Sequence, residues 1–193
     1  MSGKARDLYG SAPDKHHTAL LIIDMINDMQ FPEAPMLLEF AVPMAKRIKA
    51  LTARARRAGV PVIYVNDNFG RWRSDFKALV RHCLHSPGKK LARLLAPKAK
   101  DYFVLKPKHS AFHSTTLDLL LKHLGAHRLI LTGMASNICV LFTANDAYLR
   151  DFKLSVPSDC VCANTQQDNA HALAQMRKIL KADIRAAVKI KLQ

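Results

Sequence analysis

Three residues of this chain carry reactive side chains at, or a few residues after, points where a β-strand is expected to end: Asp24, Lys106 and Cys139. A thiolate can attack a carbonyl carbon and form a thioester. A carboxylate can take the thiol proton as a general base and return it to a leaving amine as a general acid. A protonated amine beside both groups favours their ionised forms. Together the three side chains would hydrolyse an amide, with Asp24 also activating the water that releases the acid.

Cys139 has the most informative surroundings of the three. An apolar run at 129–132 leads into Gly133, then into small residues, and then to the cysteine near the start of a helix that Ser136 or Asn137 would cap. The N-terminus of a helix carries about half a positive charge and several unpaired N–H groups. We therefore expect the Cys139 thiol to be shifted toward thiolate and the nearby backbone N–H groups to form an oxyanion hole.

The elements that would position these residues alternate along the chain. Strands are predicted at 18–23, 61–66, 102–105, 128–132, 153–156 and 184–188, and helices at 42–58, 74–85, 89–95, 115–124, from 136 or 137 to 150, and at 168–181. This alternation predicts an α/β fold of three layers, α/β/α, in which an open, mainly parallel six-stranded sheet has helices on both faces.

The predicted topology would bring the three reactive residues to one edge, because ligands bind beyond the carboxyl ends of the strands in an open parallel sheet. Each residue alone has an ordinary structural interpretation. Asp24 could cap a loop, Lys106 could lie at the surface, and Cys139 could pack in the core. Their shared position favours a catalytic site. A dinucleotide site is disfavoured, because no glycine-rich turn follows the first strand at 24–28.

The composition is that of one folded domain. The chain has 193 residues, of which 49% are hydrophobic, enough for a substantial core. We expect a single domain over 1–193 with its core at about 18–190. No apolar run reaches the roughly 18 residues of a membrane span, and residues 1–7 lack the apolar stretch of a signal peptide. A cytoplasmic protein without membrane contact is therefore expected.

The formal net charge of +15 is unusually high. The densest basic run is 46–57, in which Ile48, Leu51 and Ala55 recur at helical spacing. This pattern favours the solvent-exposed face of an amphipathic helix, and no nucleic-acid-binding motif accompanies it. Binding of nucleic acid or of an acidic partner stays open as an alternative role for this charge, although the pattern disfavours it.

The chain has four cysteines: Cys83, Cys139, Cys160 and Cys162. They do not predict a disulfide framework, because no secretory signal accompanies them. Cys160 and Cys162 form a C-x-C motif, but no second Cys or His pair with zinc-like spacing lies nearby in the sequence. The cysteines other than Cys139 are therefore expected to be structural or incidental thiols.

Three sequence blocks, in this order, resemble the isochorismatase-like cysteine hydrolases, a family that includes nicotinamidases and N-carbamoylsarcosine amidohydrolase. The first block, 19–28, holds the first strand and its aspartate. The second block, 104–115, contains Lys-Pro-Lys-His-Ser-Ala-Phe, and the third, 131–139, ends in Met-Ala-Ser-Asn-Ile-Cys. The resemblance spans roughly 18–176, which is most of the chain.

The resemblance implies a catalytic triad whose members map onto Asp24, Lys106 and Cys139. Lys108 is a rival for the lysine, but Lys106 precedes the Ser-Ala-Phe sequence by the gap that the family shows. Isochorismatases proper lack the nucleophilic cysteine. The presence of Cys139 therefore favours hydrolysis of an amide or a related C–N bond.

The resemblance also implies a cis peptide bond between Met134 and Ala135, with the backbone amides of Ala135 and Cys139 forming the oxyanion hole. Two positions depart from the family pattern. Ile26 stands where the family usually has glutamine, and Met29 stands where it usually has an aromatic residue. Both changes predict a more apolar pocket floor, so kinship alone does not identify the substrate.

The segment after the second predicted strand lacks the histidines that would bind a metal ion, so metal binding is not expected. Nicotinamidases of the family bind a metal through an Asp-x-His sequence there, whereas this chain has no histidine from 66 until His82. A nicotinamidase is therefore disfavoured. Aromatic residues near the predicted site, namely Phe69, Trp72 and Phe112, could line an acyl pocket, or they could cover the sheet as ordinary core.

The sequence thus predicts a metal-independent cysteine hydrolase without a cofactor, which cleaves a C–N bond of a small amide, ureide or carbamoyl compound through a thioester on Cys139. Two alternatives stay open. The same residues could hydrolyse a non-amide bond, or the family scaffold could serve as a binding protein for nucleic acid or an acidic partner. The resemblance also implies a homo-oligomer, a dimer or larger, with substrate pockets near the subunit contacts.

Overall fold

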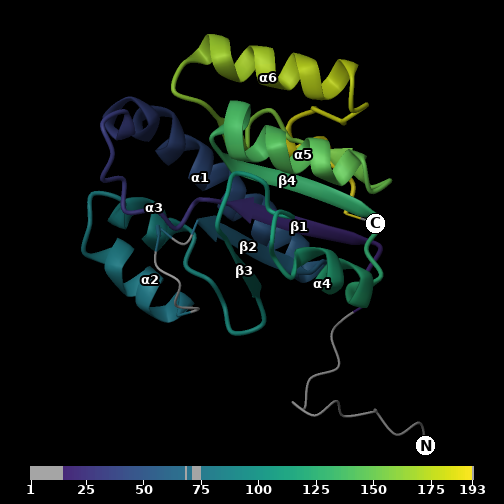
Figure 1. The fold of residues 1–193 in the computed structure, drawn as a ribbon, viewed down its shortest axis with the longest axis horizontal. Helices are drawn as coiled ribbons and strands as arrows, with labels where there is room; N and C mark the ends of the chain where they lie inside the picture. The colour runs from purple at the N-terminus through teal and green to yellow at the C-terminus, as the bar shows by residue number, and fades with distance from the viewer. Residues whose placement is uncertain (1–14, 68, 71–74, 193) are drawn as a thin grey trace, which may run out of the picture.

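Six strands in the described part of the chain form one central sheet (Figure 1). The computed structural model describes residues 15–67, 69–70 and 75–192. The strands are β1 (Thr18–Ile23), β2 (Val62–Asp67), β3 (Tyr102–Lys106), β4 (Arg128–Met134), β5 (Lys153–Ser155) and β6 (Val161–Cys162). Their order is β3-β2-β1-β4-β5, and β6 pairs with the end of β4. The described strand pairs are all parallel, as the sequence predicts.

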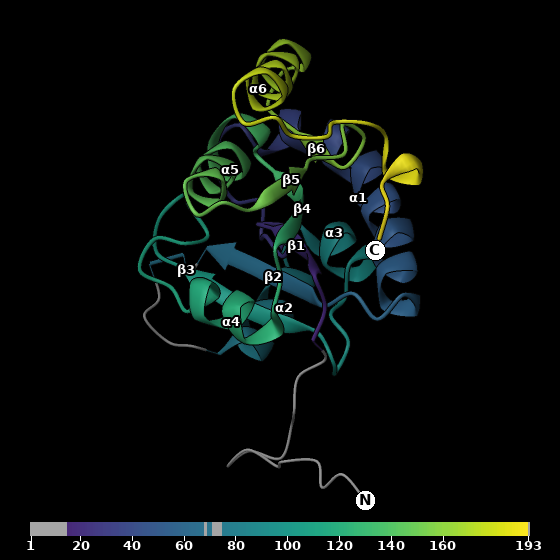
Figure 2. The same cartoon turned by 90° about the vertical axis from the view of Figure 1, so that its right-hand side faces the viewer.

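Helices cover both faces of this sheet (Figure 2). They are α1 (Ala34–Arg57), α2 (Phe76–Leu84), α3 (Lys89–Leu94), α4 (Leu117–Leu124), α5 (Leu141–Tyr148) and α6 (Gln166–Lys178). Leu20 and Ile22 of β1 point into a core shared with α1 and α3. Leu21 and Ile23 point into a second core, shared with α4, α5 and α6. The predicted three-layer α/β/α arrangement is confirmed, and it explains why β1 is apolar at every position.

Helix α1 begins earlier than the sequence predicts. We expected a helix at 42–58, but α1 starts at Ala34 and contains Pro43 in its interior. Leu37, Ala41 and Met44 are buried and extend the apolar stripe of the helix toward its N-terminus. The burial of this longer stripe outweighs the cost of one interior proline, which lacks a backbone N–H.

The basic run 46–57 forms the outer face of α1, as predicted. Arg54 and Arg56 are partly buried, because Arg54 donates to two backbone carbonyls and Arg56 donates to Asp101 at 3.1 Å. The exposed basic residues of the run are Lys46, Arg47, Lys49 and Arg57. None of the described helices combines the length and the apolar composition that crossing a bilayer requires.

The sixth strand is not where the sequence predicts it. Residues 184–186 form a loop that leads into a 3₁₀ turn, Ala187–Lys189, and β6 is instead the residue pair after Cys160. Arg54 holds this C-terminal segment against α1 by donating to two of its carbonyls at 2.8 and 3.1 Å. A two-residue strand is too short to show a periodic pattern, which explains why sequence analysis missed β6.

The two central strands approach each other closely at their carboxyl ends. Ile23 of β1 pairs with Gly133 of β4. Gly133 has φ +117°, and a Cβ at this position would lie 2.0 Å from the carbonyl oxygen of Ile23. Glycine is therefore required for the strands to approach this closely. The contact places Asp24, the residue after β1, beside the segment that leads from β4 to Cys139.

Candidate active site

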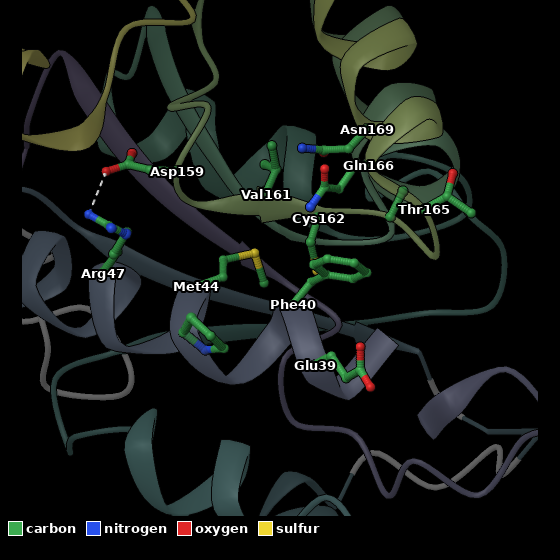
Figure 3. Close-up of a pocket in the computed structure, with 12 residues that line it drawn as sticks. Glu39, Phe40, Met44, Arg47, Asp159, Val161, Cys162, Thr165, Gln166 and Asn169 are labelled. Atoms are coloured by element: carbon green, nitrogen blue, oxygen red, sulfur yellow. Dashed lines mark ion pairs between the residues drawn. The ribbon is translucent and has the colours of Figure 1, made fainter. Parts of the chain in front are cut away.

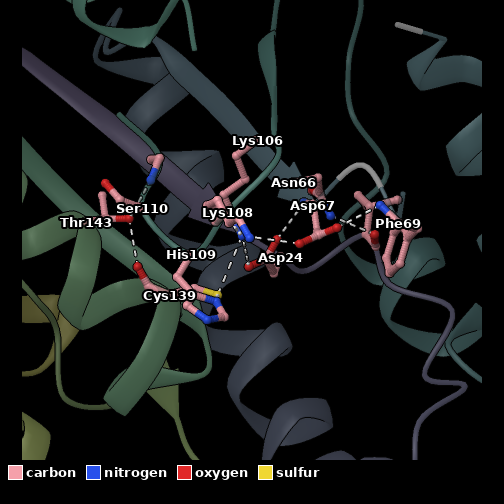
Figure 4. Close-up of polar contacts among 12 residues, drawn as sticks. Asp24, Asn66, Asp67, Phe69, Lys106, Lys108, His109, Ser110, Cys139 and Thr143 are labelled. Atoms are coloured by element: carbon pink, nitrogen blue, oxygen red, sulfur yellow. Dashed lines mark hydrogen bonds and ion pairs between the residues drawn. The ribbon is translucent and has the colours of Figure 1, made fainter. Parts of the chain in front are cut away.

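Asp24, Lys106 and Cys139 lie together at the carboxyl edge of the sheet, as predicted (Figure 4). Lys106 Nζ is 2.9 Å from Asp24 Oδ2 and 3.5 Å from Cys139 Sγ. Lys106 is the last residue of β3, an edge strand, and its long side chain passes over β2 to reach the end of β1. An acid, a base and a thiol from three distant segments therefore form one contact network.

Asp24 is held by the neighbouring strand β2. Its backbone N–H donates to the Val65 carbonyl at 2.8 Å, and its Oδ1 accepts a hydrogen bond from the Asp67 N–H at 2.7 Å. Asp24 has φ +54°, a left-handed conformation that turns the chain sharply where β1 ends. The carboxylate is thus fixed on one oxygen by the backbone, while the other oxygen faces Lys106.

Lys106 is surrounded by hydrogen-bond acceptors. Besides Asp24, its Nζ lies 3.9 Å from Asp67 Oδ2 and donates to the backbone carbonyl of Lys108 at 3.2 Å. The side chain of Lys106 is fully buried, whereas Lys108 is an exposed residue that contributes only this carbonyl oxygen to the described contacts of the site. The geometry therefore favours Lys106 over its rival.

Cys139 lies in a π-helical turn, η1 (Ser136–Val140), that leads into α5. The sequence predicted an α-helix from this point, and π turns are frequent at functional sites. The Ala135 carbonyl accepts hydrogen bonds from the N–H groups of Ile138 and Val140, at 3.1 and 3.2 Å. The peptide bond before Ala135 is cis, as the resemblance implies.

The expected shift of the Cys139 thiol toward thiolate is wrong for the resting protein. Burial, which is the largest effect, and the charge of Asp24 together raise the pKa of Cys139 to about 12 against the opposing effect of Lys106. Burial also raises the pKa of Asp24, although Lys106 opposes this effect. Burial lowers the pKa of Lys106, but the carboxylate of Asp24, helped by that of Asp67, outweighs this effect and the net pKa is raised. The resting site therefore holds a thiol beside a protonated lysine.

Two residues that sequence analysis missed complete the surroundings of Cys139. Thr143 Oγ1 donates to the Cys139 carbonyl at 2.7 Å and accepts a hydrogen bond from the Ala111 N–H at 3.0 Å. His109 Nδ1 lies 3.9 Å from Cys139 Sγ. The sequence shows only their spacing from the predicted site residues. Thr143 stands one helical turn after the cysteine, and His109 stands three residues after Lys106.

The aromatic residues proposed for an acyl pocket differ in their positions. Phe69 is half-buried beside Asp67, whose Oδ1 accepts a hydrogen bond from the Phe69 N–H at 2.7 Å, at the opposite end of the polar cluster from Cys139 (Figure 4). Phe112 is buried in the core, where its ring packs 6.0 Å from that of Phe152. These contacts place Phe112 in the core, not against the triad. Trp72 lies outside the described residues.

The two departures from the family pattern lie under α1. Ile26 and Met29 are both buried and belong to the core on that face of the sheet. Asn66 Nδ2 donates to the Ile26 carbonyl at 2.7 Å, which ties the chain after β1 to the end of β2. The side chains of Ile26 and Met29 are therefore part of the core under α1.

No group of three or more His, Cys, Asp or Glu side chains within residues 15–67, 69–70 and 75–192 is arranged to hold a metal ion. The four cysteines are unpaired, and Cys83, Cys160 and Cys162 are buried. The C-x-C motif lies in and just before β6, where Cys160 and Cys162 pack in the core under α1.

A separate hollow of about 220 Å³ lies between α1 and the segment from β6 to α6 (Figure 3). It is lined by Phe40, Met44, Cys162 and Asn169, among others. Burial raises the pKa of the Cys162 thiol to about 12, and no charged group offsets this effect. Glu39, Arg47 and Asp159 also line the hollow, but Arg47 pairs with Asp159 at 3.6 Å. Because burial alone accounts for the raised pKa of Cys162, the hollow lacks the carboxylate–ammonium–thiol contacts of the Cys139 site.

Comparison with known protein families gives one match over most of the chain. A family profile described as "Isochorismatase domain" matches residues 18–187. The isochorismatase family protein YaaI of Bacillus subtilis is 42% identical over 170 residues, covering 88% of this chain and 94% of that protein.

Two further relatives have names that state an activity. Ureidoacrylate amidohydrolase RutB of Serratia proteamaculans is 30% identical over 162 residues, covering 70% of this chain and 65% of that protein. The crystal structure of N-carbamoylsarcosine amidase from Thermoplasma acidophilum superimposes with a TM-score of 0.72 at 25% identity, covering 91% of this chain and 99% of the other.

Proposed function

Because this chain belongs to the isochorismatase family of hydrolases, we propose that it is a cysteine amidohydrolase that cleaves a C–N bond of a small amide, ureide or carbamoyl compound. The contact of Lys106 with both Asp24 and Cys139 carries the proposal, because a carboxylate, an ammonium group and a thiol can together hydrolyse an amide. The relatives support the substrate class, since one is a ureidoacrylate amidohydrolase and another an N-carbamoylsarcosine amidase.

The first half-reaction attaches an acyl group to Cys139. Because the resting thiol is protonated, Asp24 takes its proton as the sulfur attacks the carbonyl carbon. The raised pKa of Asp24 suits it to accept this proton and then return it to the leaving nitrogen. The C–N bond breaks and a thioester remains. Lys106 stays protonated and stabilises the developing thiolate.

Two backbone amides would stabilise the substrate oxygen while it is negatively charged. The proposed donors are the N–H groups of Ala135 and Cys139. The π turn supports this assignment for Cys139, because the amides that bind the Ala135 carbonyl belong to Ile138 and Val140, on either side of it. A fixed backbone donor needs no rearrangement during the reaction.

The second half-reaction releases the acyl group. Water attacks the thioester carbon, the C–S bond breaks, and the acid leaves while the thiol is restored. One water is consumed for each C–N bond that is cleaved. Lys106 supplies the positive charge beside the nucleophile, and no step of this scheme calls for a metal ion or a cofactor.

A screen for released ammonia tests the proposed function. Purified protein would be incubated with small amides, ureides and carbamoyl compounds, and Cys139→Ala should abolish the turnover of any compound that is hydrolysed. Cys162→Ala is the matched control, because this buried thiol has no catalytic partner, and it should retain turnover. Full turnover by Asp24→Ala, Lys106→Ala and Cys139→Ala alike would contradict the proposal.

We further propose that the protein is a homo-oligomer with contacts near the site. Ile138 and Phe142 are 38% and 52% exposed and flank Cys139 in the sequence. Large apolar side chains exposed beside a nucleophile would be covered by a second subunit. Size-exclusion chromatography with light scattering checks this. A monomer at every concentration tested would contradict it.

A further inference from the structure

His109 approaches the Cys139 sulfur from a different direction than the other polar groups of the site. Its Nδ1 lies 3.9 Å from Sγ, and Figure 4 shows the imidazole and the Lys106 ammonium on different sides of the sulfur. The His109 ring packs against Phe142 with 5.5 Å between ring centroids. His109 is an exposed residue, whereas Asp24 and Lys106 are buried. The imidazole therefore stands on the side of the sulfur that solvent can reach.

The backbone on both sides of His109 is held in place. The carbonyl of Lys108 accepts a hydrogen bond from the Lys106 ammonium at 3.2 Å. On the other side, Ser110 Oγ donates to the Asp146 carboxylate, and the Ala111 N–H donates to Thr143 Oγ1 at 3.0 Å. The loop is thus anchored to α5, the helix that follows Cys139. The position of His109 relative to the sulfur is built into the fold.

The two half-reactions need a base in different places. In the first, Asp24 takes the thiol proton within the buried part of the site. In the second, the proton to be removed belongs to a water molecule that arrives from solvent. Asp24 is 6% exposed, and its two oxygens already face Lys106 and the Asp67 N–H. A base on the exposed side of the sulfur is better placed to meet that water.

We propose that His109 is a further catalytic residue, the general base that activates water for hydrolysis of the thioester on Cys139. This inference rests on the proposed function, and it gives His109 the step that sequence analysis gave to Asp24. His109 Nδ1 takes a proton from water as the water oxygen bonds to the thioester carbon. The C–S bond then breaks, the acid leaves, and Nδ1 returns the proton to the sulfur. The step needs the tautomer with its proton on Nε2.

Burst kinetics with p-nitrophenyl acetate separate the two half-reactions without knowledge of the natural substrate. The rapid release of nitrophenolate reports acylation of Cys139, and the steady rate reports hydrolysis of the thioester. His109→Gln should keep the burst but lower the steady rate roughly 100-fold, which is the size of effect that general base catalysis supplies. Acetylated Cys139 should accumulate and be seen by mass spectrometry.

Two further variants distinguish proton transfer from packing. His109→Phe keeps a ring against Phe142 but cannot accept a proton, so it should behave like His109→Gln. His113→Gln changes another exposed histidine of the same loop and should leave both rates unchanged. Hydroxylamine, a strong nucleophile that needs no base, should restore turnover in both His109 variants.

The outcomes separate this inference from the proposed function. A wild-type burst with an unchanged steady rate in His109→Gln would overturn the role of His109 alone. A normal steady rate in His109→Phe would show that only ring packing matters, and would overturn it as well. Absence of an acetyl group on wild-type Cys139, or an equal burst in Cys139→Ala, would instead contradict the nucleophile and with it both proposals.

Discussion

The ammonium of Lys106 lies 2.9 Å from the carboxylate of Asp24, and both side chains are more than nine-tenths buried. Neither charge would be stable alone in such surroundings, because burial penalises each of them. Their pairing keeps the carboxylate and the ammonium group ionised beside the Cys139 thiol. The stability of the fold and the chemistry of the site therefore depend on the same contact.

Lys106→Met should remove activity and destabilise the protein. It leaves the Asp24 carboxylate buried without its partner, and breaking a buried pair in this way costs about 3–5 kcal/mol. Denaturant unfolding measures the change. Lys122→Met is the matched control, because Lys122 pairs with Asp118 at 2.7 Å but is 70% exposed. The free energy of unfolding of this control should fall by less than about 1 kcal/mol. Equal losses of unfolding free energy in the two variants would contradict the claim that the buried Lys106–Asp24 pair stabilises the fold.

Alkylation of Cys139 by iodoacetamide should show a delayed pH dependence. Only the thiolate reacts, and the pKa of this thiol is raised from 9.0 to about 12. The rate should therefore still rise about tenfold per pH unit where a model peptide thiol has already levelled off. Cys139→Ala gives the background from the buried cysteines. A rate that levels off below the peptide thiol's pKa would contradict a protonated resting thiol.

Asp24→Asn should make Cys139 more reactive toward iodoacetamide while it abolishes amide turnover. The negative charge of Asp24 raises the pKa of the thiol, so its removal lowers that pKa and increases the thiolate fraction at neutral pH. Turnover is nevertheless lost, because an asparagine at this position cannot take the thiol proton and return it to the leaving nitrogen. Slower alkylation in this variant would show that the sign of the Asp24 effect is wrong.

Thr143→Val should lower both stability and activity. It removes the hydroxyl that joins the Cys139 carbonyl to the Ala111 N–H, and an unsatisfied buried donor costs about 1–3 kcal/mol. Thr52→Val is the matched control, because Thr52 is also buried and donates to a carbonyl four residues earlier but holds no loop. Turnover should fall in Thr143→Val and stay at the wild-type rate in Thr52→Val. Equal turnover in the two variants would argue against positioning by Thr143.

Gly133→Ala should unfold more easily than Gly59→Ala, although both glycines have positive φ. A Cβ at Gly133 would lie 2.0 Å from the Ile23 carbonyl oxygen, whereas nothing lies within 4 Å of one at Gly59. Gly59→Ala should cost about 1 kcal/mol from backbone conformation alone. Gly133→Ala should lower the free energy of unfolding several times more, because the clash would push β1 and β4 apart. Thermal unfolding of the two variants, monitored by circular dichroism, checks the order.

Much of the fold could be predicted from short apolar runs. The residues of β1 are buried on both faces, so the run is continuous and its end at Asp24 is sharp. The same pattern located Lys106 at the end of β3 and the turn after β4. Since parallel strands end at one edge, the meeting of Asp24, Lys106 and Cys139 follows from topology without knowledge of any contact.

The features that could not be predicted depend on tertiary contacts, which a sequence does not show. The pKa of Cys139 is set by burial and by Asp24, a residue 115 positions away, so the N-terminal position in a helix predicted the wrong sign. His109 becomes significant only when its loop is anchored to α5. Residues 184–188 have the composition of a strand, but Arg54 binds that segment to α1.

The identity of the nucleophile is tested most directly by trapping the acyl group. Protein would be mixed with a hydrolysed amide, quenched in acid, digested and analysed by mass spectrometry. One acyl group should be found on the peptide that carries Cys139, and Cys139→Ala should carry none and release no ammonia. An acyl group on another residue, or continued ammonia release by folded Cys139→Ala, would contradict a thioester at this cysteine.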